Sequence, residues 1–455
     1  MEDHVAHVIE VPVLVAALVL DIEDPPVVMR PREVRMPRPV SDVTGRKVSS
    51  AAPISPTHTL RTPSTGAIQA SRVPSGEIRG CVRSGLPKRT SRVTKRIEGV
   101  VIPLVLLRVP DISIVGRSSA ERTIEMRVVI TGATGNVGTS LVEVLEQEAE
   151  VSAVVGLARR LPAWQPAKTT WAQVDITRDD LTPHFQGADA VVHLAWAFQP
   201  SHDQVATWRS NVLGSMRVFS AADRCGVPAL IYSSSIGAYS PANNDKPVDE
   251  TWPTHALPTA AYGREKSYVE RVLDAFERDH PDTRVVRLRP GFIFKRQAAA
   301  EQRRIFGGPL LPARFLGPGS IPVIPDLPGL RFQALHARDA AEAFRLAILK
   351  PVRGAFNLAA DPVLDAYTLG NFLGARVVKM PAWPLRCAVA AAWRLRLVPA
   401  SPMLLDLFLS LPVMDTSRAR SELGWDPAHS SFDAIRELLE GLQEGAGMDT
   451  PPLRA

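Results

Sequence analysis

Short apolar runs alternate with segments of helical periodicity between residues 126 and 290 of this 455-residue chain. The apolar runs predict buried strands at 126–130, 151–157, 191–195 and 231–235, and a further strand ending at 174–176. Helices are expected after residue 138, over 205–225 and around 262–266. Strands that alternate with helices are typical of a parallel sheet covered on both faces. The pattern predicts an α/β fold with a doubly wound parallel sheet.

A glycine-rich turn joins the first predicted strand to its helix, with the sequence Thr-Gly-Ala-Thr-Gly-Asn-Val-Gly at 131–138. In such a turn Gly132 permits the sharp bend, Gly135 lets backbone approach a pyrophosphate, and Gly138 permits close helix–strand packing. The phosphates bind unpaired N–H groups at the helix N-terminus. The turn therefore predicts a dinucleotide site, formed by Gly132, Thr134, Gly135, Asn136, Val137 and Gly138.

Two later segments carry hydroxyl and amino groups in a definite order. Residues 231–235 (Ile-Tyr-Ser-Ser-Ser) predict a strand that ends in hydroxyls, and Tyr262 and Lys266 share one helical face. The glycine turn, the serines and Tyr-x-x-x-Lys together resemble the extended short-chain dehydrogenase/reductase superfamily, in its NAD-dependent epimerase/dehydratase group. The resemblance spans about residues 126–445 and includes Arg289-Pro290-Gly291, His336-x-x-Asp339 and a closing Leu-Gly-Trp425.

The resemblance implies a Rossmann-type sheet with a smaller C-terminal substrate-binding domain. We expect an NAD(P)-binding domain at residues 126–290. Substrate-binding segments, some of which return to the Rossmann sheet, are expected at 291–445, and a flexible tail at 446–455. Within the substrate-binding part, 297–325 is expected to form a loop over the substrate. The apolar segments 384–393 and 404–413 are expected to close the small domain rather than to shape a nonpolar pocket.

The first 125 residues differ from the rest in composition. They contain no aromatic residue, many prolines, and 18 Lys and Arg against 13 Asp and Glu. Such a segment buries too little apolar area to offset its ordering entropy. Its mixed charges argue against a nucleic-acid or anionic-membrane tail, and the lack of aromatic side chains for base stacking argues further against nucleic acid. Its acidic start argues against a targeting peptide. We expect a disordered arm, or translated upstream sequence with the native product starting at Met126.

Cysteines and hydropathy limit the remaining classes of function. Cys81, Cys225 and Cys387 are widely spaced and predict neither a metal site nor a disulfide framework. The longest apolar run, 11–20, is too short to span a bilayer. We therefore expect a cytoplasmic protein with a small-molecule substrate and with no metal, nucleic-acid or membrane partner. A homodimer stays open.

The residues after the second strand bear on the choice of cofactor. Members of the resembled family that use NAD carry an acidic residue there, which accepts hydrogen bonds from the ribose hydroxyls. This chain has Ala158, followed by Arg159 and Arg160. An arginine pair can hold a 2′-phosphate through charge-assisted hydrogen bonds, although a solvated basic turn is the alternative. The sequence favours NADP over NAD.

The resemblance assigns further residues to the cofactor. Asp175 and Ile176 would hold the adenine, although Asp175 could instead cap the strand end. His193 is interpreted as a packed strand residue, and Asn211 either links its helix to the active-site strand or faces solvent. The other assigned residues are Leu194, Ala195, Trp196, Ser233 and Pro290, together with Tyr262 and Lys266.

Hydride transfer to or from a carbonyl carbon requires a proton at the adjoining oxygen. Tyr262 is the expected proton carrier, and its ordinary pKa near 10 would be lowered by Lys266 and by an oxidised nicotinamide. Lys266 would also reach the nicotinamide ribose. By resemblance Ser235 polarises the substrate oxygen, with Ser234 as the alternative.

Two departures from the family pattern affect the substrate. The segment 291–296 lacks an asparagine that sugar-nucleotide members often carry, and Phe332 stands where such members keep an arginine. Both argue against a nucleotide-sugar substrate. The leading interpretation is NAD(P)-dependent oxidoreduction of a carbonyl or alcohol on an unidentified small molecule. The alternatives are an epimerase or dehydratase that retains its cofactor, and a non-catalytic protein that senses the cofactor.

Overall fold

The computed structural model describes residues 125–242, 244–308, 316 and 320–454. Apart from Glu125, the arm expected at residues 1–125 lies outside them. Within these residues, no helix is both long enough and apolar enough to cross a membrane. The same part of the chain contains no group of three or more His, Cys, Asp and Glu side chains that could hold a metal ion.

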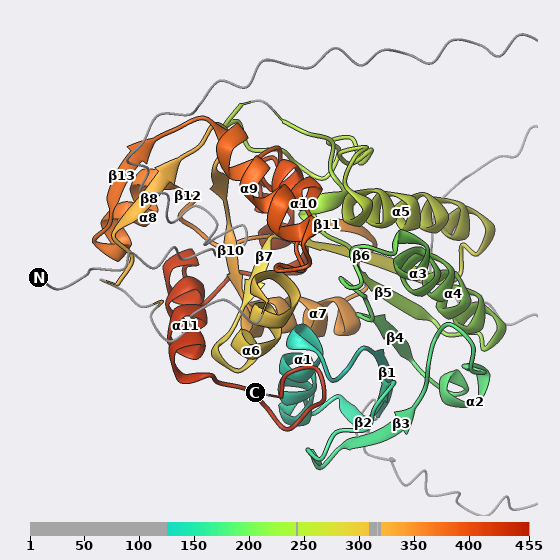
Figure 1. Ribbon diagram of the computed structural model, residues 1–455. Helices are drawn as coiled ribbons and strands as arrows, with labels where there is room; N and C mark the ends of the chain where they lie inside the picture. Colours follow the sequence, from blue (N-terminus) through green and yellow to red (C-terminus); the bar gives the residue numbers. More distant parts are fainter. Residues whose placement is uncertain (1–124, 243, 309–315, 317–319, 455) are drawn as a thin grey trace, which may run out of the picture. The chain divides into compact units, whose positions relative to one another are not determined.

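A seven-stranded parallel sheet forms the centre of the described structure (Figure 1). Its strand order is β11-β6-β5-β4-β1-β2-β3. The order reverses at β1, next to β4, so the carboxyl ends of these two strands flank a crevice. The doubly wound α/β sheet predicted from the sequence is thus confirmed. Its strands are β1 (Met126–Thr131), β2 (Val151–Ala158), β3 (Thr169–Gln173), β4 (Ala190–His193), β5 (Ala229–Ser233), β6 (Arg284–Pro290) and β11 (Gly354–Leu358).

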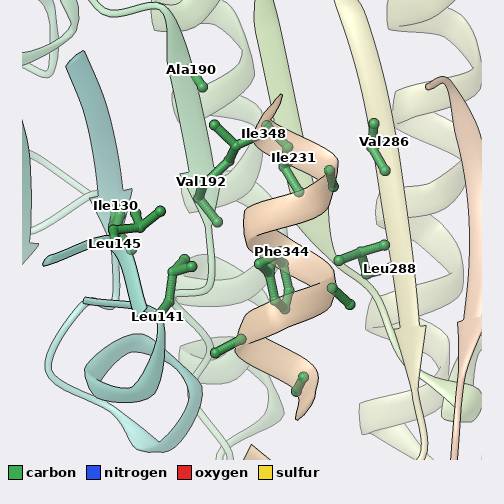
Figure 2. Close-up of a cluster of buried hydrophobic side chains, with 14 of the residues drawn as sticks. Ile130, Leu141, Leu145, Ala190, Val192, Ile231, Val286, Leu288, Phe344 and Ile348 are labelled. Atoms are coloured by element: carbon green, nitrogen blue, oxygen red, sulfur yellow. The ribbon is translucent and has the colours of Figure 1, made fainter. Parts of the chain in front are cut away.

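Helices cover both faces of this sheet, because successive strand residues alternate between two apolar cores. On one face Leu141 of α1 and Phe344 of α7 pack on Val192 and Ile231 of the sheet (Figure 2). On the other face Phe219 of α4 and Leu273 of α5 complete a second core. Burial of each such side chain stabilises the fold by about 1.5–3 kcal/mol. The helices are α1 (Asn136–Gln147), α2 (Thr182–Phe185), α3 (Gln204–Trp208), α4 (Gly214–Arg224), α5 (Ala261–Asp279) and α7 (Ala337–Leu349).

The third strand ends earlier than the sequence predicted. β3 stops at Gln173, and the chain then turns instead of continuing to Ile176. The Asp175 carboxylate fixes this turn by accepting hydrogen bonds from the backbone N–H of Thr177 at 3.0 Å and from its hydroxyl at 2.7 Å. An aspartate that bonds the backbone two residues ahead forms a turn of its own and thereby competes with the strand.

Smaller elements after β6 build a third apolar core around Phe332, Leu369 and Leu438. The strands form three two-stranded pairs, β10-β7, β12-β9 and β13-β8. These strands are β7 (Phe292–Phe294), β8 (Val323–Asp326), β9 (Arg331–Phe332), β10 (Ala334–His336), β12 (Leu364–Asp365) and β13 (Arg376–Lys379). The helices are α6 (Ala299–Gln302), α8 (Ala366–Leu373), α9 (Ala382–Arg394), α10 (Pro402–Phe408) and α11 (Ser431–Glu444).

Five short helical turns complete the described elements. Three of them are π-helical, and one of these, η1, joins α3 to α4, so the helix expected over 205–225 is α3, η1 and α4 in succession. The turns are η1 (Arg209–Leu213), η2 (Ile236–Ala238), η3 (Arg296–Ala298) and η4 (Arg303–Gly307), and a further π-helical turn, η6 (Ala419–Leu423), precedes α11.

The C-terminal residues pack against the sheet domain, where the sequence predicted a flexible tail from 446. Thr450 and Leu453 are fully buried. The Thr450 hydroxyl donates to the Thr134 carbonyl of the glycine-rich turn at 2.9 Å, and the Ala163 N–H donates to the Asp449 carbonyl at 3.2 Å. The expectation failed because the segment is anchored by contacts with residues some 300 positions earlier in the chain.

Candidate active site

A cavity of about 460 Å³ opens at the carboxyl ends of β1, β4, β5 and β6. Crevices at this edge of a doubly wound sheet are the usual ligand sites of the fold. Most of the expected site residues line it: Gly132, Gly135, Asn136, Val137, Gly138, Arg159, Leu194, Trp196, Ser233, Ser234, Ser235, Tyr262, Lys266 and Pro290. The wall as the described residues form it does not include Thr134, Arg160, Asp175, Ile176 and Ala195.

The glycine-rich turn has the tight geometry predicted from the sequence. Gly132 adopts φ +73°, and a Cβ atom on it would lie 2.7 Å from the Ala195 backbone nitrogen. A Cβ atom on Gly138 would collide with the carbonyl oxygen of Gly132. Helix α1 begins immediately afterwards at Asn136, so the first N–H groups of the helix lie at the cavity wall. Ala195 therefore packs against the turn instead of lining the cavity.

Two buried polar atoms on the cavity wall have no hydrogen-bond partner within the described structure. They are Oδ1 of Asn136 and Nε1 of Trp196. Asn136 is held in place by its amide nitrogen, which donates to the Ile293 carbonyl at 3.0 Å. Buried polar atoms are normally satisfied, so these two indicate a ligand with its own donors and acceptors. Together with the open N–H groups of α1, they fit a nicotinamide dinucleotide.

The two arginines after β2 occupy different places. Arg159 lies on the cavity wall, whereas Nη2 of Arg160 is 3.5 Å from the Pro451 carbonyl of the C-terminal segment. No carboxylate stands between them and β2, which ends at Ala158. The two arginines were expected to act as a pair, whereas in the structure only Arg159 lines the cavity.

The residues expected at the adenine make contacts within the protein and do not line the cavity. Hydrogen bonds from Thr177 keep the pKa of Asp175 below its ordinary value, although burial acts in the opposite direction as the largest single influence. Ile176 packs against Gly214 at the start of α4. Asp175 thus closes the turn after β3, and its role at the adenine stays a prediction.

Tyr262, at the start of α5, lies on the cavity wall. Its phenol is hydrogen-bonded to the Ser235 hydroxyl, and its ring stacks on Phe198 with centroids 5.0 Å apart. The backbone N–H of Gly237 donates to the Ser235 oxygen at 3.0 Å and so orients the hydroxyl. Burial raises the pKa of Tyr262 to about 12, and the bond to Ser235 only partly offsets this.

Lys266 lies one helical turn along from Tyr262. Its ammonium donates to the Ser233 carbonyl at 2.8 Å and sits 3.6 Å from the centre of the Trp196 ring. Burial lowers the pKa of Lys266 well below its ordinary value, against the effect of nearby Glu270 and Glu265. The expectation that Lys266 lowers the Tyr262 pKa is not met in this structure, where burial of the phenol and the nearby charge of Glu265 both raise it.

The three serines at the end of β5 have distinct partners. Ser234 donates to the buried carboxylate of Glu270 at 2.6 Å. Ser233 contributes its carbonyl to Lys266, and only Ser235 is bonded to the phenol of Tyr262. Because the hydroxyl of Ser234 is already committed, the geometry distinguishes Ser235 from Ser234, as the sequence alone could not.

A buried polar network behind Tyr262 was missed in the sequence. The Asn211 amide donates to Glu265 at 2.6 Å and to the Ala197 carbonyl at 2.9 Å, and the Thr207 hydroxyl donates to Glu265 at 2.7 Å. Burial raises the pKa of Glu265 above its ordinary value. Asn211 therefore links its helix to the loop after β4, which was one of its two expected roles. Glu265 lies between Tyr262 and Lys266 in sequence, a position that reads as solvent-facing.

A second buried network holds β6 against α5. Arg289 forms two hydrogen bonds with the Glu270 carboxylate, at 2.9 and 2.7 Å, and a third from Nη1 to the Tyr239 hydroxyl at 2.9 Å. Glu270 is fully buried, and the hydrogen bonds and charge of Arg289 keep its pKa below the ordinary value although burial acts against this. His193 is likewise a packed residue: burial lowers its pKa to about 3, and Thr131 and Ser215 occupy both ring nitrogens.

The other half of the cavity wall is apolar and comes from distant segments. Helix α10 and the residues after it contribute side chains, so 404–413 shapes the cavity, contrary to the expectation that it only closes the small domain. Part of the expected loop 297–325 also lines the wall, as α6 and η4; residues 309–315 and 317–319 lie outside the described structure. The apolar lining residues include Phe198, Ile236, Phe292, Ile305, Phe306, Leu404, Leu407, Phe408 and Leu411. Glu301 also lines it, and burial raises its pKa to about 7.

The family model of the NAD dependent epimerase/dehydratase family matches residues 128–359. Among similar proteins, a Synechocystis protein provisionally named dihydroflavonol 4-reductase is 32% identical over 146 residues. That match covers 31% of this chain and 42% of the Synechocystis protein. The decarboxylating sterol-4-alpha-carboxylate 3-dehydrogenase of Candida albicans is 28% identical over 54% of this chain and 68% of its own length. An uncharacterized Mycobacterium bovis protein is 26% identical over 69% of this chain and 83% of its own length.

Solved structures of the same fold include two nucleotide-sugar enzymes. A UDP-glucose-4-epimerase from Stenotrophomonas maltophila with bound NAD superposes with a TM-score of 0.52 and 21% identity. The Thermus thermophilus UDP-glucose 4-epimerase in complex with NAD gives 0.52 and 19%. Each comparison covers 70% of this chain and 99% of the other chain. At this identity the likeness extends to the fold and not to the substrate.

Proposed function

Given that this chain belongs to the NAD-dependent epimerase/dehydratase family of enzymes, we propose that it is an NADP-dependent reductase of an apolar carbonyl compound. One observation carries the proposal. The Tyr262 phenol, bonded to Ser235, stands between a glycine-rich dinucleotide turn and an apolar wall in the same cavity. A nicotinamide held by the turn would supply the hydride, and the apolar wall would hold the substrate.

Proton transfer is assigned to Tyr262. With a pKa of about 12, its phenol is protonated at neutral pH and is therefore suited to donate a proton to the oxygen of a carbonyl under reduction. Ser235 would hold that oxygen through its hydroxyl. Lys266, which Trp196 and the Ser233 carbonyl fix in place, would hold the ribose of the cofactor.

The preference for NADP rests on Arg159. Its guanidinium lies on the cavity wall near the end of β2, and no carboxylate follows Ala158 to repel a 2′-phosphate. A planar guanidinium forms two charge-assisted hydrogen bonds with a phosphate, which a ribose hydroxyl pair cannot match. Arg160 contributes less, because it points to the Pro451 carbonyl of the C-terminal segment.

The apolar wall supports a hydrophobic substrate over a nucleotide sugar. Phe332, which replaces an expected arginine, is buried against Phe292 and Phe408. The neighbouring Arg331 is engaged with Asp245 at 3.0 Å and with the Ala242 carbonyl. Two of the similar proteins are named for a dihydroflavonol and a sterol carboxylate, which is consistent with this choice.

A panel assay tests the proposal. Purified protein is given NADPH or NADH with apolar aromatic and alicyclic ketones, and separately with UDP-sugars, while oxidation of the cofactor is followed. We expect NADPH oxidation with members of the ketone set and none with UDP-sugars. Isomerisation of a UDP-sugar without net cofactor oxidation would instead identify an epimerase. Cofactor binding without turnover of any compound would favour a sensing protein.

A further inference from the structure

Helix α9 is poorly covered by the rest of the protein. Of its thirteen residues only Ala392 is buried. Trp383 exposes 68% of its surface, and Leu395 and Leu397, directly after the helix, expose 69% and 41%. A surface helix of a globular protein normally buries its apolar stripe. Exposed apolar side chains thus stand at both ends of α9, and large apolar side chains on a surface mark a site of interaction.

The charge of this region is of one sign. Residues 366–405 contain no Asp or Glu and five basic residues, Arg376, Lys379, Arg386, Arg394 and Arg396. Arg386 pairs with Asp406 at 2.8 Å. Arg394 and Arg396 are exposed and form no ion pair with any described residue. A helix that combines exposed tryptophan and leucine with unpaired arginines is typical of segments that lie in a lipid interface.

The residue with a left-handed backbone conformation just after α9 is an arginine, although a glycine would be less strained there. Arg396 adopts φ +60°, and its N–H and that of Leu397 donate to the Trp393 and Ala392 carbonyls, each at 2.9 Å. This pattern of a left-handed residue after the helix favours glycine. At the ends of α8 and α11 the left-handed residue is indeed a glycine, Gly374 or Gly445. The strained backbone conformation of Arg396 therefore indicates that its side chain has a role.

The α9 region is joined to the rim of the cavity. The Trp393 indole donates to the Ser201 hydroxyl at 2.9 Å, and that hydroxyl donates to the Pro399 carbonyl at 2.6 Å. Gln199, on the cavity wall, donates to the carbonyls of Pro399 and Ile305. The chain then enters α10, which lines the cavity. The exposed apolar surface and the apolar cavity are therefore connected through a few residues.

We propose that the α9 surface, defined as Trp383, Arg394, Leu395, Arg396 and Leu397, docks the protein on an anionic lipid bilayer. Docking there brings the cavity rim to the interface, so that an apolar substrate enters from the lipid phase. The second statement rests on the proposed function, whereas the first does not. The expectation of no membrane partner rested on the lack of a spanning segment and on the mixed charges of residues 1–125, and neither argument bears on an interfacial helix in the C-terminal part.

Vesicle sedimentation with the full-length chain tests the docking. We expect binding to vesicles of phosphatidylcholine with one quarter phosphatidylglycerol, weakening as salt is added, and little binding to phosphatidylcholine alone. Arg394→Gln and Arg396→Gln should each lower the partition coefficient roughly fivefold, the effect of one charge at such a surface. Arg278→Gln, an exposed arginine at the end of α5, is the matched control and should leave the partition coefficient unchanged.

Arg396→Gly separates binding from folding. Glycine relieves the left-handed strain, so the variant should melt at a higher temperature and still bind anionic vesicles about fivefold less. A more stable variant with unchanged vesicle binding would overturn the proposal, as would equal binding of the unmodified protein to neutral and anionic vesicles. Self-association without vesicles that Trp383→Ser abolishes would show that a second copy covers this surface, which would also overturn it.

Turnover of a water-soluble ketone in vesicle-free buffer is measured on the same samples. The α9 variants should retain it, because none of these residues lines the cavity. Vesicle binding without any turnover would refute the proposed function and leave the docking intact. Turnover without vesicle binding would refute the docking and leave the proposed function intact.

Discussion

The two halves of the cavity are built in different ways. The cofactor half, to which we assign the dinucleotide, is built around the turn Gly132 to Gly138, whose backbone N–H groups lie at the cavity wall. The substrate half is formed by side chains from Phe198, η4 and α10, which lie up to about two hundred residues apart. Backbone chemistry in a local motif is shared by many sequences. Side chains assembled from distant segments can vary independently, which is how one fold accepts different substrates.

Tyr262 lies at the boundary of the two halves, so its removal should have the largest effect. Tyr262→Phe should lower kcat about 10²- to 10⁴-fold, because only the transferable proton is lost and the ring still stacks on Phe198. The Kd for NADPH, measured by calorimetric titration, should stay the same. Ser234→Ala should lower kcat far less. Near-normal turnover of the Tyr262 variant would mean that another group carries the proton.

Strand β6 and helix α5, which both contribute to the cavity wall, are held together by the buried ion pair between Arg289 and Glu270. Arg289→Ala should lower the free energy of unfolding by about 3–5 kcal/mol, because Glu270 would stay buried without its partner. Arg278→Ala breaks an exposed pair with Asp279 and should leave that free energy nearly unchanged. Denaturant titrations of both variants give the comparison. Equal losses would show that burial of the pair does not govern its contribution.

The cofactor half should distinguish its two arginines. Arg159→Ala should weaken NADPH binding by about 1–3 kcal/mol while NADH binding changes little. Arg160→Ala should have a clearly smaller effect, because that side chain faces Pro451. Fluorescence titrations with both cofactors measure this. Similar affinities of the unmodified protein for NADPH and NADH would contradict the assignment of NADP.

A substitution on the apolar wall should change substrate binding without changing cofactor binding. Leu404→Asn should raise KM for an apolar ketone by about tenfold, since one apolar contact in a binding pocket contributes about 1–3 kcal/mol. Cofactor affinity should stay unchanged, because Leu404 belongs to the apolar wall and not to the glycine-rich turn. Steady-state kinetics with each ligand varied in turn provide the measurement. A parallel rise in the NADPH Kd would show that the two halves are not separable.

The buried His193 side chain allows a test of how burial makes the free energy of unfolding depend on pH. Its pKa is about 3 in the folded protein against an ordinary value of 6.5, so the unfolded chain binds more protons between these values. Proton binding by the unfolded chain therefore lowers the free energy of unfolding as pH falls from about 6.5 toward 3. Above about pH 6.5 this loss of stability is absent. Unfolding titrations should show less pH dependence in this window for His193→Gln. An identical pH dependence in the variant would assign the effect to other groups.

The comparison of the two halves also explains what the sequence could predict. The sheet and the turn at 131–138 follow local patterns, and the resemblance to a family gave Tyr262, Lys266 and Ser235 as candidates. The apolar segment 404–413 was recognised as helical, yet its place on the cavity wall depends on tertiary packing. A sequence pattern reports which residues are apolar and not what they face.

Errors in the sequence analysis arose where a side chain or segment met a distant partner. Asp175 bonds Thr177 and ends the third strand early. Thr450 donates to the Thr134 carbonyl and anchors the C-terminal segment. The Tyr262 pKa is raised because Phe198 and its neighbours exclude water, an effect that charge spacing along a helix does not reveal. In each case a contact set by packing outweighed the local signal.

Transfer of label from cofactor to product tests the central claim most directly. NADPH carrying deuterium at C4 of the nicotinamide, on the transferred face, is incubated with the protein and a ketone that is turned over. The product is then examined by mass spectrometry. We predict one deuterium on the former carbonyl carbon and one NADP⁺ per product, both lost with Tyr262→Phe. A product isomeric with the substrate, formed without NADP⁺ release, would contradict the account.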